Sequence, residues 1–262
     1  MKLCKFLIII SKQVGQKAFR IRFITILKLI ERDAAGAWWY NQALRPQLDL
    51  DAWPEPSIQR FRRRMGERGF RVWALDLTTE FRIPVVIALA QTDNPNVPML
   101  LGLGAHYRVE VALQRALAEL TQSLREDTEA PEGHWWHTVR QANPAYLYPD
   151  LTQPMRRPAD FIDQSTDDLL TDIERAVALM RAEGMELIVH DLTRPETGLN
   201  VMRVIVPGLS HFWPRFGDPR PPNTSDKDCA LPHTGQDNED GAPAAVQLNA
   251  LLPFPSSQEA GE

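Results

Sequence analysis

A glycine-containing segment that leads into an amphipathic helix constrains the fold of this chain more than any other feature. Within residues 109–124 the apolar side chains recur at steps of three and four, which predicts a helix with one stripe against a core. The preceding segment, Gly102-Leu-Gly-Ala-His106, carries two glycines and predicts a loop. We expect His106 to anchor that loop, although a catalytic base is the alternative.

A second face of the same helix carries Arg115, Glu119 and Gln122, at spacings i, i+4 and i+7. Carboxylate and amide oxygens suit a hydrated Mg²⁺, and a guanidinium binds phosphate, so this face is compatible with a metal and phosphate site. A solvated helix face with an Arg–Glu pair has the same spacing. Spacing alone favours the solvated face.

Composition excludes several classes of protein. The chain has 262 residues, of which 44% are hydrophobic, enough for one large domain or two small ones. Its net charge of −5 argues against a nucleic-acid partner. Cys4 and Cys229 lack metal-ligand spacing, so we expect no zinc site or disulfide and a cytoplasmic location. No apolar run approaches the ~18 residues of a membrane-spanning helix, so no membrane partner is expected.

The order of predicted elements favours an α/β or α+β domain with a mixed sheet, because helices and strands alternate without uniform spacing. The sequence patterns predict helices at residues 29–40, 57–65, 109–124 and 167–183 and strands at 71–76, 84–89, 186–191 and 202–207. We expect Ser57 to cap the second helix and Gly184 to end the fourth. A polar, tryptophan-bearing insertion covers residues 126–165, and its His134 and His137 favour an aromatic loop over a metal site.

Five short motifs, taken in order, resemble the YcaO family. They are Asp76-Leu-Thr-Thr-Glu-Phe-Arg-Ile-Pro-Val-Val86, Gly102-Leu-Gly-Ala-His106, the helix with Arg115, Glu119 and Gln122, Asp191-Leu-Thr-Arg-Pro195, and Val204-Ile-Val-Pro-Gly-Leu209. The resemblance covers roughly residues 29–216. It implies a YcaO-like domain that is incomplete at its N-terminus. It also implies ATP-dependent activation of a peptide-backbone amide, with ATP and Mg²⁺ as cofactors.

The resemblance assigns the site residues. Glu31 and Arg32 match the end of the family's first nucleotide signature, S-x-x-x-E-x-x-E-R, but Ile24 and Lys28 stand where it has serine and glutamate. An ammonium in place of a carboxylate should repel a metal ion. The implied Mg²⁺ ligands are Glu31 and Glu119, and the implied ATP contacts are Glu31, Arg32, Arg115, Gln122 and Arg203.

The C-terminal tail resembles the proline-rich end of the azoline-forming members. It has the sequence Leu251-Leu-Pro-Phe-Pro255, with Leu251 in place of the first proline. A rigid polyproline segment can place a chain end in an active site, so the resemblance gives Pro253 and Pro255 a catalytic role. The alternative is an ordinary disordered tail.

Residues 1–28 differ from the rest of the chain. Five of the six lysines fall there, and residues 1–30 hold seven basic side chains, seven isoleucines and no acidic residue. A signal peptide and an amphipathic membrane or transit helix are two interpretations. We favour a third, a non-native start joined by a late initiation or a shifted frame. The expected organisation thus has four parts. A non-native or atypical basic segment at residues 1–28 is followed by a YcaO-like domain at 29–216, a disordered linker at 217–247 and a proline-containing tail at 248–262.

The resemblance implies that a Cys, Ser or Thr of a ribosomal precursor peptide is converted to an azoline. It implies a leader-peptide-binding protein as the second partner, and a homodimer is one candidate oligomeric state. Two alternatives stay open. One is a catalytically impaired remnant that serves as a peptide-binding or interaction subunit, and the other is a thioamide-forming enzyme.

Overall fold

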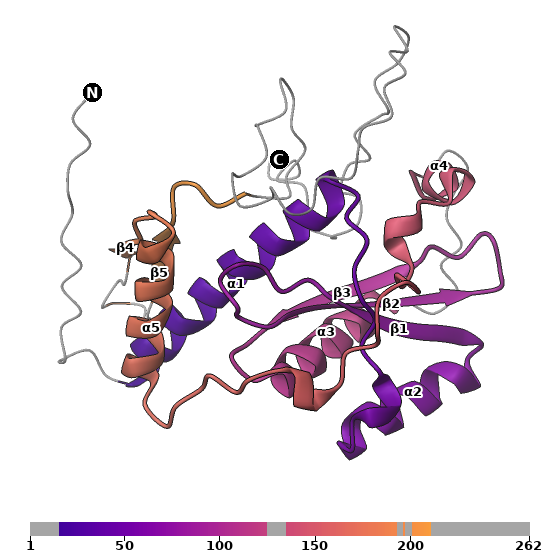
Figure 1. Cartoon of the computed structure of the whole chain (residues 1–262), viewed down its shortest axis with the longest axis horizontal. Coiled ribbons are helices and arrows are strands. Elements are labelled where there is room, and N and C mark those ends of the chain that lie inside the picture. Colours follow the sequence, from indigo (N-terminus) through magenta and orange to yellow (C-terminus); the bar gives the residue numbers. More distant parts are fainter. Residues whose placement is uncertain (1–15, 125–134, 193–195, 197–200, 211–262) are drawn as a thin grey trace, which may run out of the picture.

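The structure is a computed structural model that describes residues 16–124, 135–192, 196 and 201–210 (Figure 1). Its α-helices are α1 (Gln16–Tyr40), α2 (Pro56–Glu67), α3 (Val109–Ser123), α4 (Trp135–Ala142) and α5 (Leu169–Ala182). Its strands are β1 (Phe70–Asp76), β2 (Val85–Thr92), β3 (Leu100–Ala105), β4 (Ile188–Asp191) and β5 (Met202–Ile205). Short 3₁₀ turns lie at Leu50–Ala52, Ala145–Leu147 and Pro158–Asp160. The predicted α/β class is confirmed, but the strand pairs of both described sheets are antiparallel, so the expected mixed sheet is not found among these residues.

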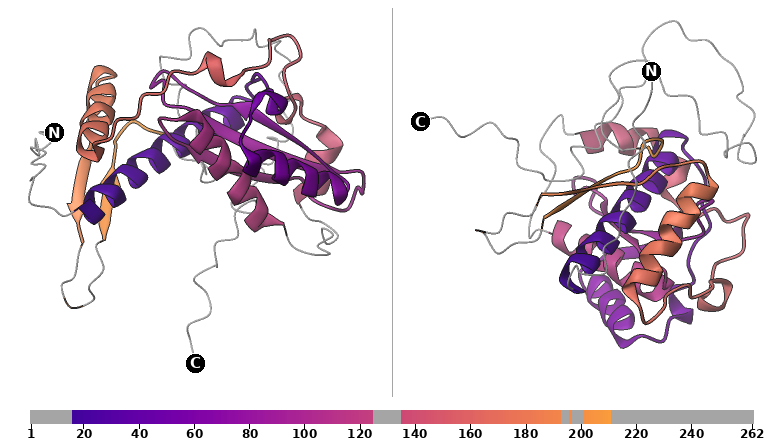
Figure 2. Two further views of the ribbon diagram at one scale, coloured as in Figure 1. Left: turned by 90° about the horizontal axis from the view of Figure 1, so that it is seen from below. Right: turned by 90° about the vertical axis from the view of Figure 1, so that its left-hand side faces the viewer.

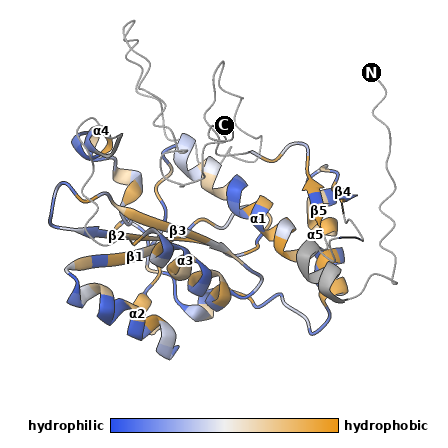
Figure 3. Cartoon of the chain, turned by 180° about the vertical axis from the view of Figure 1, so that it is seen from behind, coloured by the Kyte–Doolittle hydropathy of each residue, from blue (hydrophilic) through white to orange (hydrophobic). Residues whose placement is uncertain are grey.

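The central sheet has the strand order β1-β2-β3, and both neighbouring pairs are antiparallel. Alternate residues of β2 face opposite sides: Val85 and Ile87 join the hydrophobic cluster of α1, and Val86 and Ala88 join that of α3. Because both faces are covered, β2 is apolar at nearly every position, as the colouring of Figure 3 shows. The sheet is therefore a middle layer between α1 and α3.

The segment expected to be a loop, Gly102-Leu-Gly-Ala-His106, is instead mostly strand β3. Its glycines do not make the segment flexible. They leave room for the backbone of α3 to pack directly against the strand. A Cβ on Gly102 would lie 2.2 Å from the carbonyl oxygen of Ala116, and one on Gly104 would lie 2.1 Å from that of Ala112. The loop prediction was wrong because a glycine in a strand can mark close packing as well as a turn.

The helix predicted at residues 29–40 is longer, because α1 begins at Gln16. Phe23, Ile26 and Leu27 are buried, so the core continues across the predicted boundary at residue 28. At its C-terminal end, the rings of Trp38 and Tyr146 meet edge to face with centroids 5.4 Å apart. The origin of residues 1–28 stays a prediction.

The second predicted helix is confirmed as α2, but its N-cap is Glu55 rather than Ser57. Pro56 takes the first helical position, where its lack of an N–H costs nothing, and Ser57 therefore lies inside the helix. The third predicted helix is α3. The fourth is α5, which ends before Gly184, a glycine in the left-handed region at φ +73°.

A second, smaller sheet pairs β4 with β5 in antiparallel register, with Ile188 opposite Ile205. It lies at the same end of the molecule as α5, and α5 contacts α1 (Figure 2). The buried hydroxyl of Tyr107, just after β3, donates to the carbonyl oxygen of Asp172 in α5 at 2.8 Å. This hydrogen bond ties the central sheet to α5.

Candidate functional site

Two carboxylates that come from separate parts of the sequence meet at one ammonium. The Nζ atom of Lys28 lies 2.7 Å from Oε1 of Glu31 and 3.3 Å from Oε2 of Glu119. We call these three residues the Lys28 triad. Lys28 and Glu31 belong to α1, whereas Glu119 belongs to α3. Since the two helices cover opposite faces, the triad forms beyond β3, the last strand in the sheet order.

Local structure explains how each member reaches the triad. Lys28 and Glu31 are three residues apart on one helix, which places their side chains on neighbouring turns. Glu119 is carried by α3, whose backbone rests directly on Gly102 and Gly104. The close contact between α3 and β3 thus brings the carboxylate of Glu119 within reach of α1.

The triad lies where the protein meets solvent. The side chain of Glu31 is only 5% exposed, whereas those of Glu119 and Lys28 are 28% and 43% exposed. Burial raises the pKa of Glu31, and the nearby ammonium of Lys28 opposes that shift. Burial lowers the pKa of Lys28, but the carboxylates, chiefly Glu31, outweigh it and the net shift is upward. Lys28 therefore keeps its positive charge at neutral pH and compensates a buried acid.

Arg115 lies one helical turn before Glu119 and fixes the end of β3. Its guanidinium donates to the carbonyl oxygen of Ala105 at 2.9 Å. Its charge also acts on the triad, because, like Lys28, it opposes the rise that burial causes in the pKa of Glu31. Arg115 thus contributes a second cationic group on the α3 side.

His106 anchors the short turn between β3 and α3, rather than a loop over residues 102–106. Its Nδ1 accepts a hydrogen bond from the backbone N–H of Arg108 at 3.1 Å. Burial, together with the charges of Arg115 and Arg108, lowers the pKa of His106 to about 4. The imidazole is therefore neutral at physiological pH, which suits an acceptor role.

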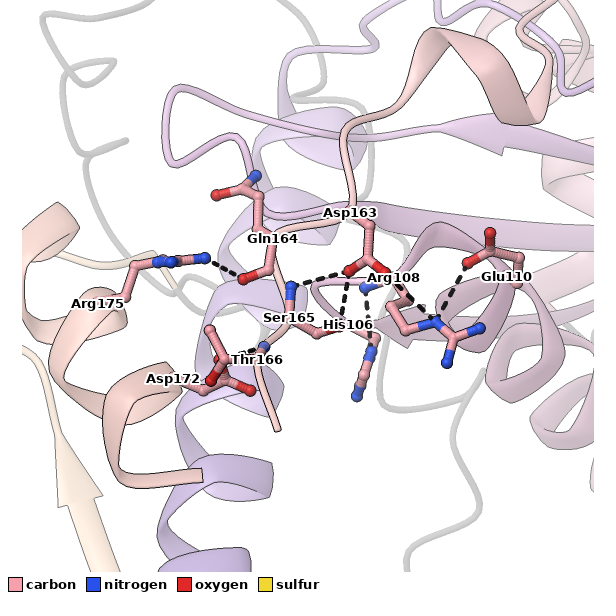
Figure 4. A network of polar contacts seen from close by, with 9 residues as sticks. All are labelled: His106, Arg108, Glu110, Asp163, Gln164, Ser165, Thr166, Asp172 and Arg175. Carbon is pink, nitrogen blue, oxygen red and sulfur yellow. Dashed lines mark hydrogen bonds and ion pairs between the residues drawn. The ribbon is translucent and has the colours of Figure 1, made fainter. Parts of the chain in front are cut away.

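Polar contacts continue from this turn towards α5 (Figure 4). Nε of Arg108 lies 3.8 Å from carboxylate oxygens of both Glu110 and Asp163. Asp163 in turn accepts a hydrogen bond from the backbone N–H of Ser165 at 2.8 Å. Arg175 of α5 donates to the carbonyl oxygen of Gln164. The network joins the start of α3, the segment before α5, and α5 itself.

The other predicted site residues lie in different settings. Arg32 is half-buried in α1, Gln122 is exposed near the end of α3, and Arg203 is exposed on β5 opposite His190. Neither Gln122 nor Arg203 makes a hydrogen bond or ion pair with Glu31 or Glu119. Pro253, Pro255 and His134 lie outside the described residues. The roles given to all of these residues stay predictions.

Lys28 was expected to repel a metal ion, and its contact with both carboxylates was not predicted. The i, i+3 spacing of Lys28 and Glu31 was the available signal. The contact with Glu119 depends on tertiary packing and had no signal in the sequence.

The residues of the triad do not fit a Mg²⁺ ion between Glu31 and Glu119. The ammonium of Lys28 already stands within 3.3 Å of both carboxylates. Magnesium binds oxygen at about 2.0–2.1 Å and needs that same space. Among the described residues, no group of three His, Cys, Asp or Glu side chains converges on a common point.

Family comparison defines the class of protein. Residues 23–210 match the family described as YcaO cyclodehydratase, ATP- and Mg²⁺-binding. The chain therefore belongs to the YcaO family. Its helices among the described residues include none that is long and apolar enough to cross a bilayer.

Two curated relatives are similar to this chain over most of its length. A protein of Methanothermobacter thermautotrophicus is 30% identical over 206 residues, covering 72% of this chain and 52% of the relative. A protein of Haemophilus influenzae is 28% identical over 230 residues, covering 76% and 36% respectively. The chain thus spans about half, or less, of the length of these relatives.

Three solved structures are also similar to most of this chain, which again covers only part of each of them. A heterocyclase solved in complex with substrate and cofactor is 36% identical, with a TM-score of 0.68 over 74% of this chain and 27% of its own. The heterocyclase TruD is 33% identical, with a TM-score of 0.71 over 78% of this chain and 29% of its own. YcaO from Methanopyrus kandleri, bound with AMPPCP and Mg²⁺, shares the fold at 24% identity and a TM-score of 0.64, over 76% of this chain and 54% of its own.

Proposed function

We propose that this chain serves ATP-dependent activation of peptide-backbone amides, with Cys, Ser or Thr of a ribosomal precursor peptide as the residue that is cyclised. The observation that carries the proposal is the meeting of Glu31 and Glu119 at the edge of β3. These residues match two separate family signatures, and a shared site is what a common role requires. The similar heterocyclase with bound substrate and cofactor supports the same reaction class.

The reaction itself is a dehydration driven by ATP. The side-chain thiol or hydroxyl gives up its proton to solvent and attacks the preceding carbonyl carbon, which forms a C–S or C–O bond and leaves the negative charge on the former carbonyl oxygen. That oxygen attacks the γ-phosphorus of ATP and releases ADP. The C–O bond to phosphate then breaks, the ring nitrogen loses its proton, and the azoline C=N bond forms.

The protein's contribution to such a reaction is positioning and charge compensation. The guanidinium of Arg115 lies beside the triad and carries several N–H donors, one of which already binds Ala105. We assign it and Arg32 to the phosphates, because planar guanidinium groups bind phosphate oxygens in pairs. Gln122, Arg203, Pro253 and Pro255 belong to the same proposal on the strength of the family motifs.

Two macromolecular partners complete the proposal. The precursor peptide is the substrate, and a leader-peptide-binding protein delivers it. We expect both encounters to take place in the cytoplasm. A homodimer is the oligomeric state to test first.

The direct test combines the purified chain, ATP and a cysteine-containing precursor peptide, and it measures phosphate release together with loss of one water from the peptide. Glu119→Gln should lower phosphate release by roughly tenfold or more, since one charge is lost from the site. Glu110→Gln is the matched control on the same helix. Equal rates for the two variants would remove Glu119 from the reaction. A peptide that exchanges oxygen for sulfur when sulfide is supplied would identify the thioamide alternative.

Lys28 favours a second candidate function. Its ammonium stands where the family signature has a carboxylate, so the site departs from the family at one of its charged positions. A subunit that binds the peptide without turning over ATP would tolerate this change. Peptide binding by fluorescence anisotropy without phosphate release would favour the binding subunit over the enzyme.

A further inference from the structure

We propose that Lys28 is the chain's own replacement for a divalent cation between Glu31 and Glu119, and that it makes the contact between α1 and α3 independent of metal. The inference goes beyond the proposed function, because it rests on the packing of two helices and not on turnover. It identifies Lys28 as the residue that determines whether this site takes a metal ion.

The geometry supports replacement rather than coexistence. A lysine ammonium has three N–H donors, and here two acceptors on different helices lie 2.7 and 3.3 Å away. A metal ion would also draw one oxygen from each helix. The ammonium therefore performs the same bridging task through hydrogen bonds, from the same position between the same two side chains.

Charge balance leads to the same conclusion. Two carboxylates near one another repel, and a buried one such as Glu31 requires a compensating charge to remain ionised. Lys28 supplies that charge and leaves the triad with a net charge of about −1 instead of −2. A divalent ion that entered would gain less attraction and would be repelled by the ammonium. The site thus compensates its own charge and disfavours Mg²⁺.

The contacts of Lys28 also connect two different helices. Glu31 and Lys28 lie on one helix, so a bond between them alone would be an ordinary i, i+3 pair. The bond to Glu119 joins α1 to α3 across the edge of β3. Removing the ammonium should therefore loosen the junction of the two helices, and a divalent ion should be able to restore it.

The test uses the full chain in four forms: the wild type, Lys28→Glu, Lys28→Gln, and Lys28→Glu combined with Glu119→Gln. Two quantities are measured, Mn²⁺ binding by electron paramagnetic resonance and the unfolding temperature with Mg²⁺ or with EDTA. Arg64→Glu, an exposed site on α2, controls for the change in net charge.

The wild type should bind Mn²⁺ no better than the Arg64→Glu control, and its unfolding temperature should be the same in Mg²⁺ and EDTA. Lys28→Glu should bind Mn²⁺ about tenfold more tightly or better, because three carboxylates then face one point. Its unfolding temperature should rise with Mg²⁺. Both gains should disappear when Glu119→Gln is added.

Two results would overturn the proposal. One is Mn²⁺ binding by the wild type that is at least as tight as that of Lys28→Glu. The other is a folded Lys28→Glu protein with no gain in Mn²⁺ affinity. Where Lys28→Glu does not fold, Lys28→Gln decides the matter: a gain in Mn²⁺ affinity supports the proposal and no gain contradicts it. Because neither measurement involves ATP turnover, a failure of the proposed function is seen separately.

Discussion

The carbonyl oxygen of Ala112 in α3 lies 2.1 Å from the point where a Cβ on Gly104 of β3 would stand. The helix backbone can rest on the strand only because this position has no side chain. The same relationship holds at Gly102, one helical turn further along α3. Since α3 carries Glu119, these two glycines set the position of a carboxylate that lies on another element.

We predict that Gly104→Ala lowers the free energy of unfolding by about 2–4 kcal/mol, because the added methyl group must displace helix backbone rather than a flexible side chain. Urea denaturation measures the change. Gly66→Ala in α2 is the matched control, since no atom lies within 4 Å of its added Cβ. That variant should be neutral or more stable by about 0.5–1 kcal/mol. Equal effects at the two glycines would contradict the close-packing explanation.

A second prediction is that the two ion pairs of Lys28 contribute unequally to the free energy of unfolding. Lys28→Gln should cost about 1–3 kcal/mol, because it leaves the buried Glu31 without its counter-charge. Glu119→Gln should cost about 1 kcal/mol or less, since both partners of that pair are partly exposed. Guanidinium denaturation in EDTA distinguishes the two. A cost at Glu119 as large as that at Lys28 would show that Glu31 does not depend on the ammonium.

A third prediction concerns pH. The pKa of His106 is lowered to about 4 in the folded chain, whereas an unfolded histidine titrates near 6.5. Below pH 6.5 the unfolded state therefore binds the extra proton and the folded state does not. The stability due to neutral His106 is fully present above pH 6.5 and falls as the pH drops towards 4, by roughly 1–3 kcal/mol.

His106→Asn tests this assignment, because the asparagine oxygen can still accept from the N–H of Arg108 but does not titrate. Its unfolding free energy should depend less on pH between 4 and 6.5 than that of the wild type. Identical pH profiles for the two proteins would assign the dependence to other groups. The other histidines are unchanged in this comparison and cancel.

The fourth prediction contrasts two buried tryptophans. Nε1 of Trp73 donates to the carbonyl oxygen of Leu147 at 3.0 Å, and its ring stacks on Tyr148. Nε1 of Trp53 has no hydrogen-bond partner among the described residues. Trp73→Phe should therefore destabilise the chain by about 1 kcal/mol more than Trp53→Phe, as measured by thermal unfolding. A larger loss at Trp53 would show that packing volume outweighs the hydrogen bond.

The spacing of apolar residues was sufficient to predict those helices and strands whose buried side chains follow a regular pattern. The helix α3 and the strands β1 and β2 follow their apolar patterns, and Gly184 ends α5 as expected. The glycines of β3 led to a wrong loop prediction. The sequence alone does not distinguish a glycine that forms a turn from one that allows a helix to pack closely on a strand. The N-cap of α2 was missed because Pro56 made an earlier start available.

The candidate site was only partly predictable. Family signatures pointed to Glu31 and Glu119, and the structure places both beside one ammonium. Lys28 was expected to disturb a metal site and instead bridges the two acids. That outcome depends on how closely α3 approaches β3, a distance that no local pattern encodes. The remaining motif residues, such as Gln122 and Arg203, are exposed and lack contacts that would test their roles.

Whether Lys28 takes the place of a metal ion is tested most directly by the electron density at the Lys28 triad, in crystals of the full chain grown with Mn²⁺. We predict that the ammonium of Lys28 lies between Glu31 and Glu119, as here, and that no anomalous manganese peak stands between them. A manganese peak at coordination distance from both carboxylates, with Lys28 turned towards solvent, would show that the site takes a metal ion and that Lys28 does not replace it.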